Sequence, residues 1–414
     1  MTSDRRRQFG AYIARLRREA RMSQRQLAER MCAVSGVATL TRNEVSRWER
    51  GERIPDVWLS TLAQVLRVPL PDLERAASHA RGETLPDGAP SPAETLSTLL
   101  PLDDLLKPAD GTGRRVGMST VDALAGRVHG LRLADDVLAG HDLIAPAFRE
   151  LRAAIRLYRE STHTDQTGRS LLVQIGELAQ ITGWIASDAG QHAQAERAYR
   201  LGISAAREAG DTPLVGNLAG SLAYQYANTG RTAEAVQLAQ AALEEAGSDS
   251  HPAARALSWD RIAWAHTRAG HTQPALRALG EAHDALADDA PEEPPQWAYW
   301  VCEEELRVMD ARVYTELHRP LRAVPLLTDV LARYDTTHAR ELALYLSWLA
   351  MAYADANEPE EAASIASRVL ELSQQVASER TAERSRAVLC CLRSFEEVPE
   401  VRSLLDEYRH LLTA

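Results

Sequence analysis

The sequence predicts an all-α protein made of a small N-terminal head and a long body of helical repeats. Hydrophobic residues make up 45% and charged residues 25% of the chain, as in globular proteins, and aromatic residues only 5%. Alanine and leucine are abundant and β-branched runs are rare, which favours helix over strand. The length of 414 residues exceeds one ordinary core, so two or more domains are expected. Turn-like residues recur at similar spacings from residue 190 onwards, which predicts repeated helical units.

Charge is distributed unevenly between these parts. Residues 1–75 contain 15 arginines and 9 acidic residues, whereas the remainder contains 32 basic and 49 acidic residues. A basic head on an acidic body is the pattern expected when only the head meets phosphate groups.

Several function classes find no support in the sequence. No apolar run is long enough for a membrane span, and the arginines at 5–7 are not followed by the apolar core of a signal peptide, so we expect a cytoplasmic protein without membrane contact. The four cysteines lack CxxC spacing and a paired histidine, so neither a metal site nor a disulfide framework is expected. HExxH, GxSxG and Walker motifs are missing, so no enzyme activity and no cofactor are expected. The acidic run 303–305 is interpreted as a solvated helix face.

Cap residues and apolar spacing predict five helices in the head. Ser23 and Thr41 are suited to N-cap the second and third helices, and Gly51 is suited to end the third. The expected helices span about 5–20, 24–31, 41–50 and 57–66, and a fifth begins at Pro71.

The motifs of these segments carry a family resemblance. The string MSQRQLAER at 22–30 is followed by TRNEVSRWERGERIP at 41–55, which includes a Trp-Glu-x-Gly sequence. Over about residues 8–75 the chain resembles the helix-turn-helix domain of the xenobiotic-response-element (XRE) family of transcriptional regulators, which has the lambda- and Cro-repressor-like fold. A longer connection than usual in this family, Cys32 to Leu40, separates the second and third helices.

The resemblance implies that double-stranded DNA is the partner of the head. The third helix would enter the major groove, where Arg suits guanine and Asn suits adenine. It also implies that Arg17 pairs with Glu49, tying the first helix to the third. Arg42, Asn43 and Arg47 match the family's base-contacting positions, and Gln24 matches a phosphate contact. The full implied set of DNA-contacting residues is Gln24, Thr41, Arg42, Asn43, Ser46, Arg47 and Arg53.

A segment rich in Pro, Gly and Asp follows the head. This composition cannot bury a core and predicts a flexible linker. The expected organisation is therefore a head at 1–80, a linker at 81–118 and a repeat body at 119–414.

The body resembles tetratricopeptide repeats, in which pairs of helices stack into a superhelix. An alanine follows each turn-like residue by five positions, and small and mostly aromatic residues precede it at fixed spacings. The turn-like residues are Gly190, Gly230, Gly270, His318 and Asn357. The expected repeats span about 169–210, 211–250, 251–290, 291–337 and 338–378, with flanking helix pairs at 119–161 and 379–412.

In such a superhelix the first helix of each pair lines the concave surface. Equivalent positions then place aromatic and arginine side chains on one wall, which suits a small-molecule or peptide effector. The alternative interpretation of the same residues is packing between repeats. The predicted groove residues are Trp184, Tyr224, Trp264, Arg268 and Arg312.

A helix-turn-helix head on such a body resembles actinobacterial regulators and, more distantly, quorum-peptide receptors. The resemblance implies a sequence-specific transcriptional regulator whose body forms a homodimer, senses an effector, or both. The alternative is a scaffold of repeats whose head docks another protein and not DNA.

Overall fold

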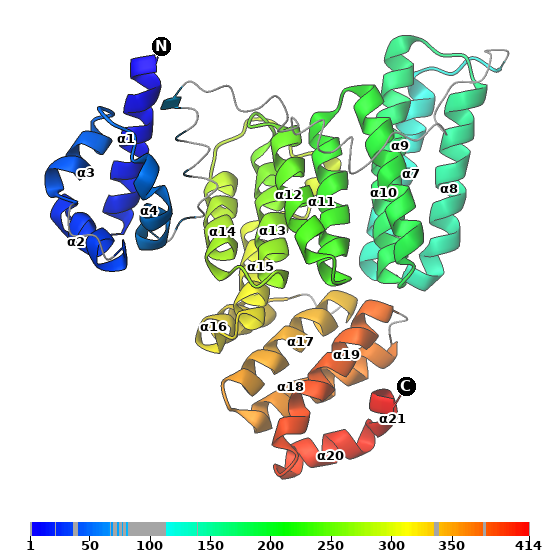
Figure 1. Ribbon diagram of the computed structural model, residues 1–414. Coiled ribbons are helices and arrows are strands. Elements are labelled where there is room, and N and C mark those ends of the chain that lie inside the picture. The colour runs from blue at the N-terminus through cyan, green and yellow to red at the C-terminus, as the bar shows by residue number, and fades with distance from the viewer. Residues whose placement is uncertain are drawn as a thin grey trace. The chain divides into compact units, whose positions relative to one another are not determined.

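The computed structural model describes residues 2–20, 22–35, 40–66, 68, 73, 77, 80–81, 113–138, 140–334, 339–375 and 378–413. The chain divides into two compact units, Met1–Ser91 and Pro92–Ala414, whose helices are drawn in Figure 1. The described residues form helices and no strand in either unit, so the all-α prediction is confirmed.

The head contains the first four of the expected helices. The second helix continues one turn beyond the predicted Met31, and the fourth begins with a 3₁₀ turn. Residues 36–39 and most of the expected fifth helix lie outside the described residues, although Leu73, Ala77 and Ala80 are buried in the head's core. The elements are α1 (Thr2–Glu19), α2 (Gln24–Ser35), α3 (Arg42–Glu49), η1 (Asp56–Trp58) and α4 (Leu59–Leu66).

Side-chain capping accounts for the start of α2 but not for that of α3. The backbone N–H of Gln26 donates to Ser23 Oγ at 3.2 Å, and the N–H of Ser23 donates to Gln26 Oε1 at 2.8 Å. This reciprocal pair is a capping box, which satisfies two amides at the start of α2. Thr41 has the extended backbone of an N-cap, but its side chain accepts no hydrogen bond, so the predicted side-chain cap is wrong.

Two glycines let α1 pack closely against the end of α3. Gly51 has a φ of +72°, and a Cβ atom there would lie 2.5 Å from the carbonyl oxygen of Arg6. A Cβ atom on Gly10 would lie 2.5 Å from the carbonyl oxygens of Trp48 and Glu49. Glycine is therefore required at both positions for the approach of α1 and α3.

The second unit is a series of antiparallel helix pairs. Five pairs occupy the segments expected for the repeats, and further helices lie on both sides of them in the sequence (Figure 1). Its helices are α7 (Met118–Val137), α8 (Gly140–Glu160), α9 (Asp165–Asp188), α10 (His192–Ala209), α11 (Thr212–Asn228), α12 (Thr232–Ala246), α13 (Pro252–Arg268), α14 (Thr272–Leu286), η3 (Gln296–Ala298), α15 (Glu303–Glu316), α16 (Pro320–Leu331), α17 (Ala339–Asp355), α18 (Pro359–Gln375), α19 (Glu379–Leu392), η4 (Arg393–Phe395), α20 (Pro399–Glu407) and α21 (Arg409–Thr413).

The five predicted turn residues all adopt the left-handed backbone conformation that ends a helix. The φ angles are 73° at Gly190, 87° at Gly230, 76° at Gly270, 53° at His318 and 62° at Asn357. Each lies between the two helices of one pair, so the predicted positions of these turns are confirmed.

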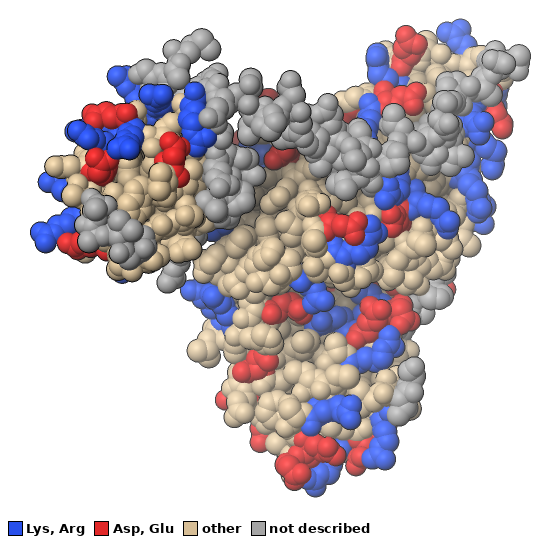
Figure 2. Space-filling model, viewed as in Figure 1, with Lys and Arg blue, Asp and Glu red and all other residues tan. Residues whose placement is uncertain are grey.

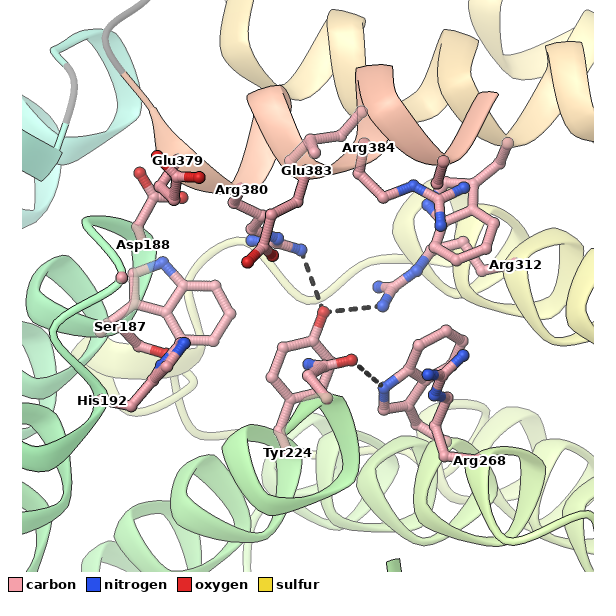
Figure 3. Close-up of a pocket in the computed structure, with 17 residues that line it drawn as sticks. Ser187, Asp188, His192, Tyr224, Arg268, Arg312, Glu379, Arg380, Glu383 and Arg384 are labelled. Atoms are coloured by element: carbon pink, nitrogen blue, oxygen red, sulfur yellow. Dashed lines mark hydrogen bonds between the residues drawn. The ribbon is translucent and has the colours of Figure 1, made fainter. Parts of the chain in front are cut away.

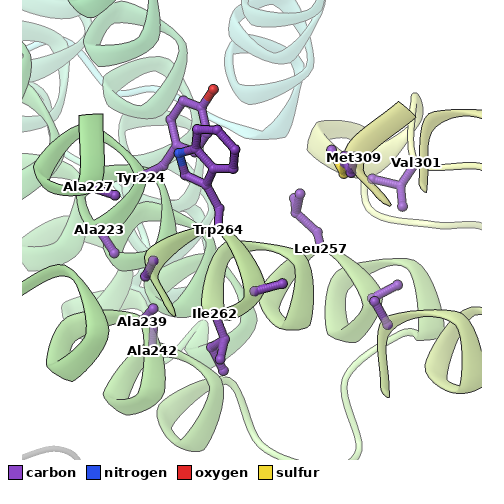
Figure 4. Close-up of a cluster of buried hydrophobic side chains, with 14 of the residues drawn as sticks. Ala223, Tyr224, Ala227, Ala239, Ala242, Leu257, Ile262, Trp264, Val301 and Met309 are labelled. Carbon is purple, nitrogen blue, oxygen red and sulfur yellow. The ribbon is translucent and has the colours of Figure 1, made fainter. Parts of the chain in front are cut away.

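Small residues let the paired helices approach each other. Ala223, Ala263 and Ala311, which precede the aromatic positions, are fully buried. At Gly183 a Cβ atom would lie 2.6 Å from the ring of Tyr199, so only glycine fits there. Figure 4 shows alanine side chains between α11 and α12, and the rings of Tyr224 and Trp264 next to each other.

The segment before α7 differs from expectation at its end. Residues 82–112 of the expected linker lie outside the described residues. The N–H of Val116 donates to the carbonyl of Thr162 at 3.0 Å, and the N–H of Thr162 donates to the carbonyl of Arg114 at 3.2 Å. These last linker residues therefore belong to the ordered body.

Within the described part of the chain, no helix is both long and apolar enough to cross a membrane.

Candidate functional site

Helix α3 has one buried face and one polar face. Val45 and Trp48 are 0% and 2% exposed and anchor the helix in the head's core. Arg42, Asn43 and Arg47 lie exposed, as does Thr41 before the helix, and Ser46 is half-buried. The three side chains predicted to contact bases therefore share the accessible side of one short, well-anchored helix.

In the absence of DNA, Glu44 forms ion pairs with two of the arginines predicted to contact DNA. Its Oε1 lies 3.2 Å from Arg47 Nη1, and its Oε2 lies 3.6 Å from Arg53 Nη1. Side chains of both arginines are more than half exposed. Exposed ion pairs of this kind contribute little stability, so the arginines can exchange Glu44 for another anion.

The predicted pair of Arg17 and Glu49 lies at the centre of a larger network. Arg17 Nε donates to Glu49 Oε1 at 2.5 Å, and Arg17 Nη2 donates to Glu49 Oε2 at 3.0 Å. Gln24 Nε2 donates to the same Oε2 at 2.7 Å. The side chain predicted to touch phosphate at Gln24 is thus used inside the head, and only the start of α2 remains for an anion there.

Arginine side chains lie around much of the head on the face drawn in Figure 2, with acidic side chains between them. This distribution agrees with the basic composition of the first 75 residues.

In the body, the three predicted aromatic side chains form a continuous ladder. The ring centroids of Trp184 and Tyr224 are 5.7 Å apart, and those of Tyr224 and Trp264 are 6.2 Å apart. Trp348 of α17 extends the ladder, since its ring meets Trp264 edge-on at 5.6 Å. Because α9, α11 and α13 each supply one of the first three rings, equivalent repeat positions do converge in space.

The ladder borders a cavity of about 230 Å³, shown in Figure 3. All five predicted groove residues line it: Trp184, Tyr224, Trp264, Arg268 and Arg312. Trp264 Nε1 donates to Asn228 Oδ1 at 3.0 Å, which fixes that indole at the wall.

Other helices of the body cover the predicted aromatic wall. Tyr224 and Trp264 are only 7% and 3% exposed, because α17 and α19 cover the face that a regular superhelix would leave open. Arg384 of α19 lies over the Trp348 ring at 3.5 Å. The site is therefore a cavity within the body.

Sequence reasoning missed the arginines that complete this cavity. Arg380 and Arg384 lie one turn apart on α19, which was expected only as a flanking helix. Arg261, which lines a neighbouring cavity and not this one, lies one turn before Trp264 on α13, and its guanidinium is 4.6 Å from the Tyr224 ring. The four-residue spacing on α19 was the available signal, since it places both arginines on one helix face.

A second cavity of about 460 Å³ lies next to the first. The ends of α15 and α17 give it an acidic region containing Glu305 and Glu341. Two other aromatic wall residues, Trp297 and Trp300, come from the segment between α14 and α15. Trp184, Tyr224, Leu344, Arg312 and Arg380 line both cavities.

Glu305 was expected on a solvated face and is instead half-buried. Its Oε2 accepts a hydrogen bond from Tyr345 Oη at 2.8 Å. Burial raises the pKa of Glu305 above its ordinary value, although Tyr345 partly opposes this.

Arginines surround the hydroxyl of Tyr224. Burial alone would raise the pKa of Tyr224, but Arg312, Arg380 and Arg261 lower it to about 7. Arg312 Nη2 and Arg380 Nη2 donate to the phenol oxygen at 2.7 and 3.0 Å. This oxygen is therefore a strong acceptor in a cationic environment.

Residues 8–77 match the family model described as a helix-turn-helix domain. This supports a DNA-binding regulator. No curated protein matches the sequence. Among solved structures, the chain is similar to the crystal structure of BtubC (BKLC) from P. vanneervenii, with 17% sequence identity and a TM-score of 0.41. That match covers 57% of this chain and 92% of the other.

Proposed function

We propose that the protein is a sequence-specific transcriptional regulator of the XRE type that reads DNA with α3. The observation that carries this proposal is the exposed set of Arg42, Asn43 and Arg47 on the third helix of a helix-turn-helix domain. Arg and Asn can each form two hydrogen bonds to a purine edge in the major groove. Arg53 and the start of α2 are suited to the phosphates beside that groove.

The body, in this proposal, has a regulatory role and no catalytic one. It forms a homodimer, because one head offers few phosphate contacts for tight specific binding. It also binds an organic effector in the cavity bordered by the aromatic ladder. Buried aromatic walls with a few polar groups are typical of small-molecule sites.

The base-reading role of Arg47 can be tested directly. Arg47→Ala should weaken binding to the cognate site by about 1–3 kcal/mol and relax preference at one base pair, because a bidentate contact is lost. Genome-wide footprinting of the wild-type protein identifies the site, and binding isotherms on cognate and random duplexes measure the change. Arg402→Ala removes the same charge from an exposed position on α20 and should leave both affinities unchanged.

If Arg47→Ala lost the same binding affinity on cognate and on random DNA, Arg47 would contact only phosphate and not a base. The salt dependence of binding distinguishes a DNA-binding head from a head that docks protein. DNA affinity should fall steeply as the salt concentration rises, because each phosphate contact releases counterions. A head that docks protein would bind duplex DNA at most weakly, with no preferred sequence.

A further inference from the structure

Within the described part of the chain, only some of the arginines beside the ladder have a carboxylate partner. Arg261 lies 3.2 Å from Asp260, and Arg268 lies 2.5 Å from Glu316. By contrast, Arg312 and Arg380 form no ion pair with a carboxylate among the described residues, and both donate to the same phenol oxygen (Figure 3). Their shared partner, Tyr224, is the only hydrogen-bond acceptor that the structure gives to either within that described part.

Arg312 also has unused hydrogen-bonding capacity. It is 8% exposed, and its buried Nε has no hydrogen-bond partner among the described residues. A buried charged donor without a partner is costly unless a ligand or another group satisfies it. Arg312 lines both cavities, so such a ligand can reach it.

Three carboxylates line the smaller cavity, and the two oxygens of one of them, Asp188, are buried without a hydrogen-bond partner among the described residues. Glu379 pairs with Arg386 at 2.7 Å, and Asp188 lies 3.8 Å from Arg340. Glu383 is exposed and lies one turn after Glu379 on α19. None of the three is within ion-pair distance of Arg312 or Arg380.

We infer that Arg312 and Arg380 bind the oxyanion, a carboxylate or a phosphate, of an aromatic organic acid whose ring packs against the ladder. This inference rests on the proposed effector site and names the chemical class of its ligand. The planar guanidinium group suits a two-oxygen anion, and the neighbouring rings of Trp184, Trp264 and Trp348 offer apolar faces. The smaller cavity, at about 230 Å³, exceeds the roughly 150 Å³ that holds a benzene molecule in a protein core.

Tyr224 takes the place of this anion when the site is empty. Its oxygen accepts the hydrogen bonds that the ligand would accept, so ligand and phenol compete for the same two guanidinium groups. Removing the phenol oxygen should therefore strengthen binding of the acid.

Three probes with the same ring test the inference on the full chain without DNA. Titration calorimetry at pH 8 should show saturable binding of 2-naphthoate or 2-naphthyl phosphate, and about tenfold weaker or no binding of neutral 2-naphthamide. The stronger of the two acids identifies whether carboxylate or phosphate is preferred. Arg380→Gln should remove the preference for acid over amide, whereas Arg402→Ala on α20 should preserve it.

Tyr224→Phe provides an outcome that misfolding cannot mimic. It should bind the acid about threefold or more tightly than the wild type, because the competing oxygen is gone. Equal binding of acid and amide, loss of acid binding in Tyr224→Phe, or no binding of either acid at millimolar concentration would each overturn the inference. Sequence-specific DNA binding by α3 is measured separately, so failure here would leave the DNA-binding proposal standing.

Discussion

Tyr224 combines an apolar and a cationic environment in one residue. Its ring stacks between Trp184 and Trp264, while its oxygen accepts from Arg312 and Arg380. A phenol in this position can ionise near neutral pH, because the arginines stabilise the phenolate more than burial penalises it.

The pKa of Tyr224 predicts a pH-dependent contribution to stability. A phenol has a pKa of about 10 in the unfolded chain, against about 7 in the folded one. Stabilisation should therefore develop as pH rises through 7, be complete near pH 10, and be lost as pH falls through 7. The unfolding free energy of the wild type relative to Tyr224→Phe should increase between pH 7 and pH 9, as measured by urea denaturation.

Other groups near this phenol must be considered in that experiment. The charged and titratable groups that affect it are Arg261 of α13, Arg312 of α15, Arg380 and Arg384 of α19, and Tyr199 of α10. Arginines stay charged over this range, and burial raises the pKa of Tyr199 beyond it. A difference between the two proteins that stays constant from pH 7 to pH 9 would contradict ionisation of Tyr224.

Glu49 connects two helices of the head, so its removal should be costly. Its side chain is 9% exposed and accepts from Arg17 and Gln24. Glu49→Ala leaves the Arg17 charge buried without a carboxylate, and should destabilise the head by about 3 kcal/mol. Hydrogen exchange of the α1 and α3 amides in the full chain measures this loss.

A matched ion pair in the same head supplies the control. Arg25 and Glu29 are 79% and 59% exposed, so Arg25→Ala should change head protection by less than about 0.5 kcal/mol. If Glu49→Ala had no larger effect than this, the network would be structurally unimportant.

The positions and partners of single residues could be predicted from the sequence where a repeat or a family motif determines them. The ladder positions follow from their equivalent places in three repeats, and the Arg17–Glu49 pair follows from the family resemblance. Arg380 was not predictable in this way, because its partner Tyr224 is 156 residues distant. Only the fold of the whole body brings these two side chains together.

At the scale of elements, the turns were the most predictable features. Three of the turns have glycine, which tolerates positive φ. His318 and Asn357 adopt positive φ at the equivalent turns although they are not glycine. The lengths of α2 and the 3₁₀ start before α4 were not predictable, because helix ends depend on packing as well as on capping residues.

Gly230 and Gly280 form a matched pair that tests the turn argument. A Cβ atom would meet nothing within 4 Å at either position, but Gly230 has a φ of +87° and Gly280 lies within α14. Gly230→Ala should destabilise the body by about 1 kcal/mol through backbone strain alone. Gly280→Ala should stabilise it by about 0.5–1 kcal/mol, because alanine favours helix. Urea midpoints of the two variants should move in opposite directions; movement in the same direction would show that backbone conformation does not control these sites.

At the scale of the molecule, the sequence prediction misses the contacts between helices of the body that are far apart in the sequence. Arg340 of α17 donates to Asp135 of α7 at 3.1 and 3.2 Å, joining residues 205 positions apart. Both side chains are 6% exposed. Burial, opposed mainly by Arg340, raises the pKa of Asp135 to about 6. The spacing of the repeats predicts contacts only between neighbouring helix pairs. The ion pair between α7 and α17 could therefore not be predicted from the sequence.

Two-fold DNA binding by a homodimer is a prediction that concerns the whole molecule. If the body joins two chains about a two-fold axis, their heads present two copies of α3 to one duplex. The footprinted sites should then contain inverted half-sites about 10 base pairs apart, or a multiple of that spacing. Light scattering on the saturated complex should give two chains per duplex, and a duplex with only one half-site should bind far more weakly. A single half-site occupied by one chain at full affinity would mean that the body does not pair the heads, and that its cavities act on a monomeric regulator.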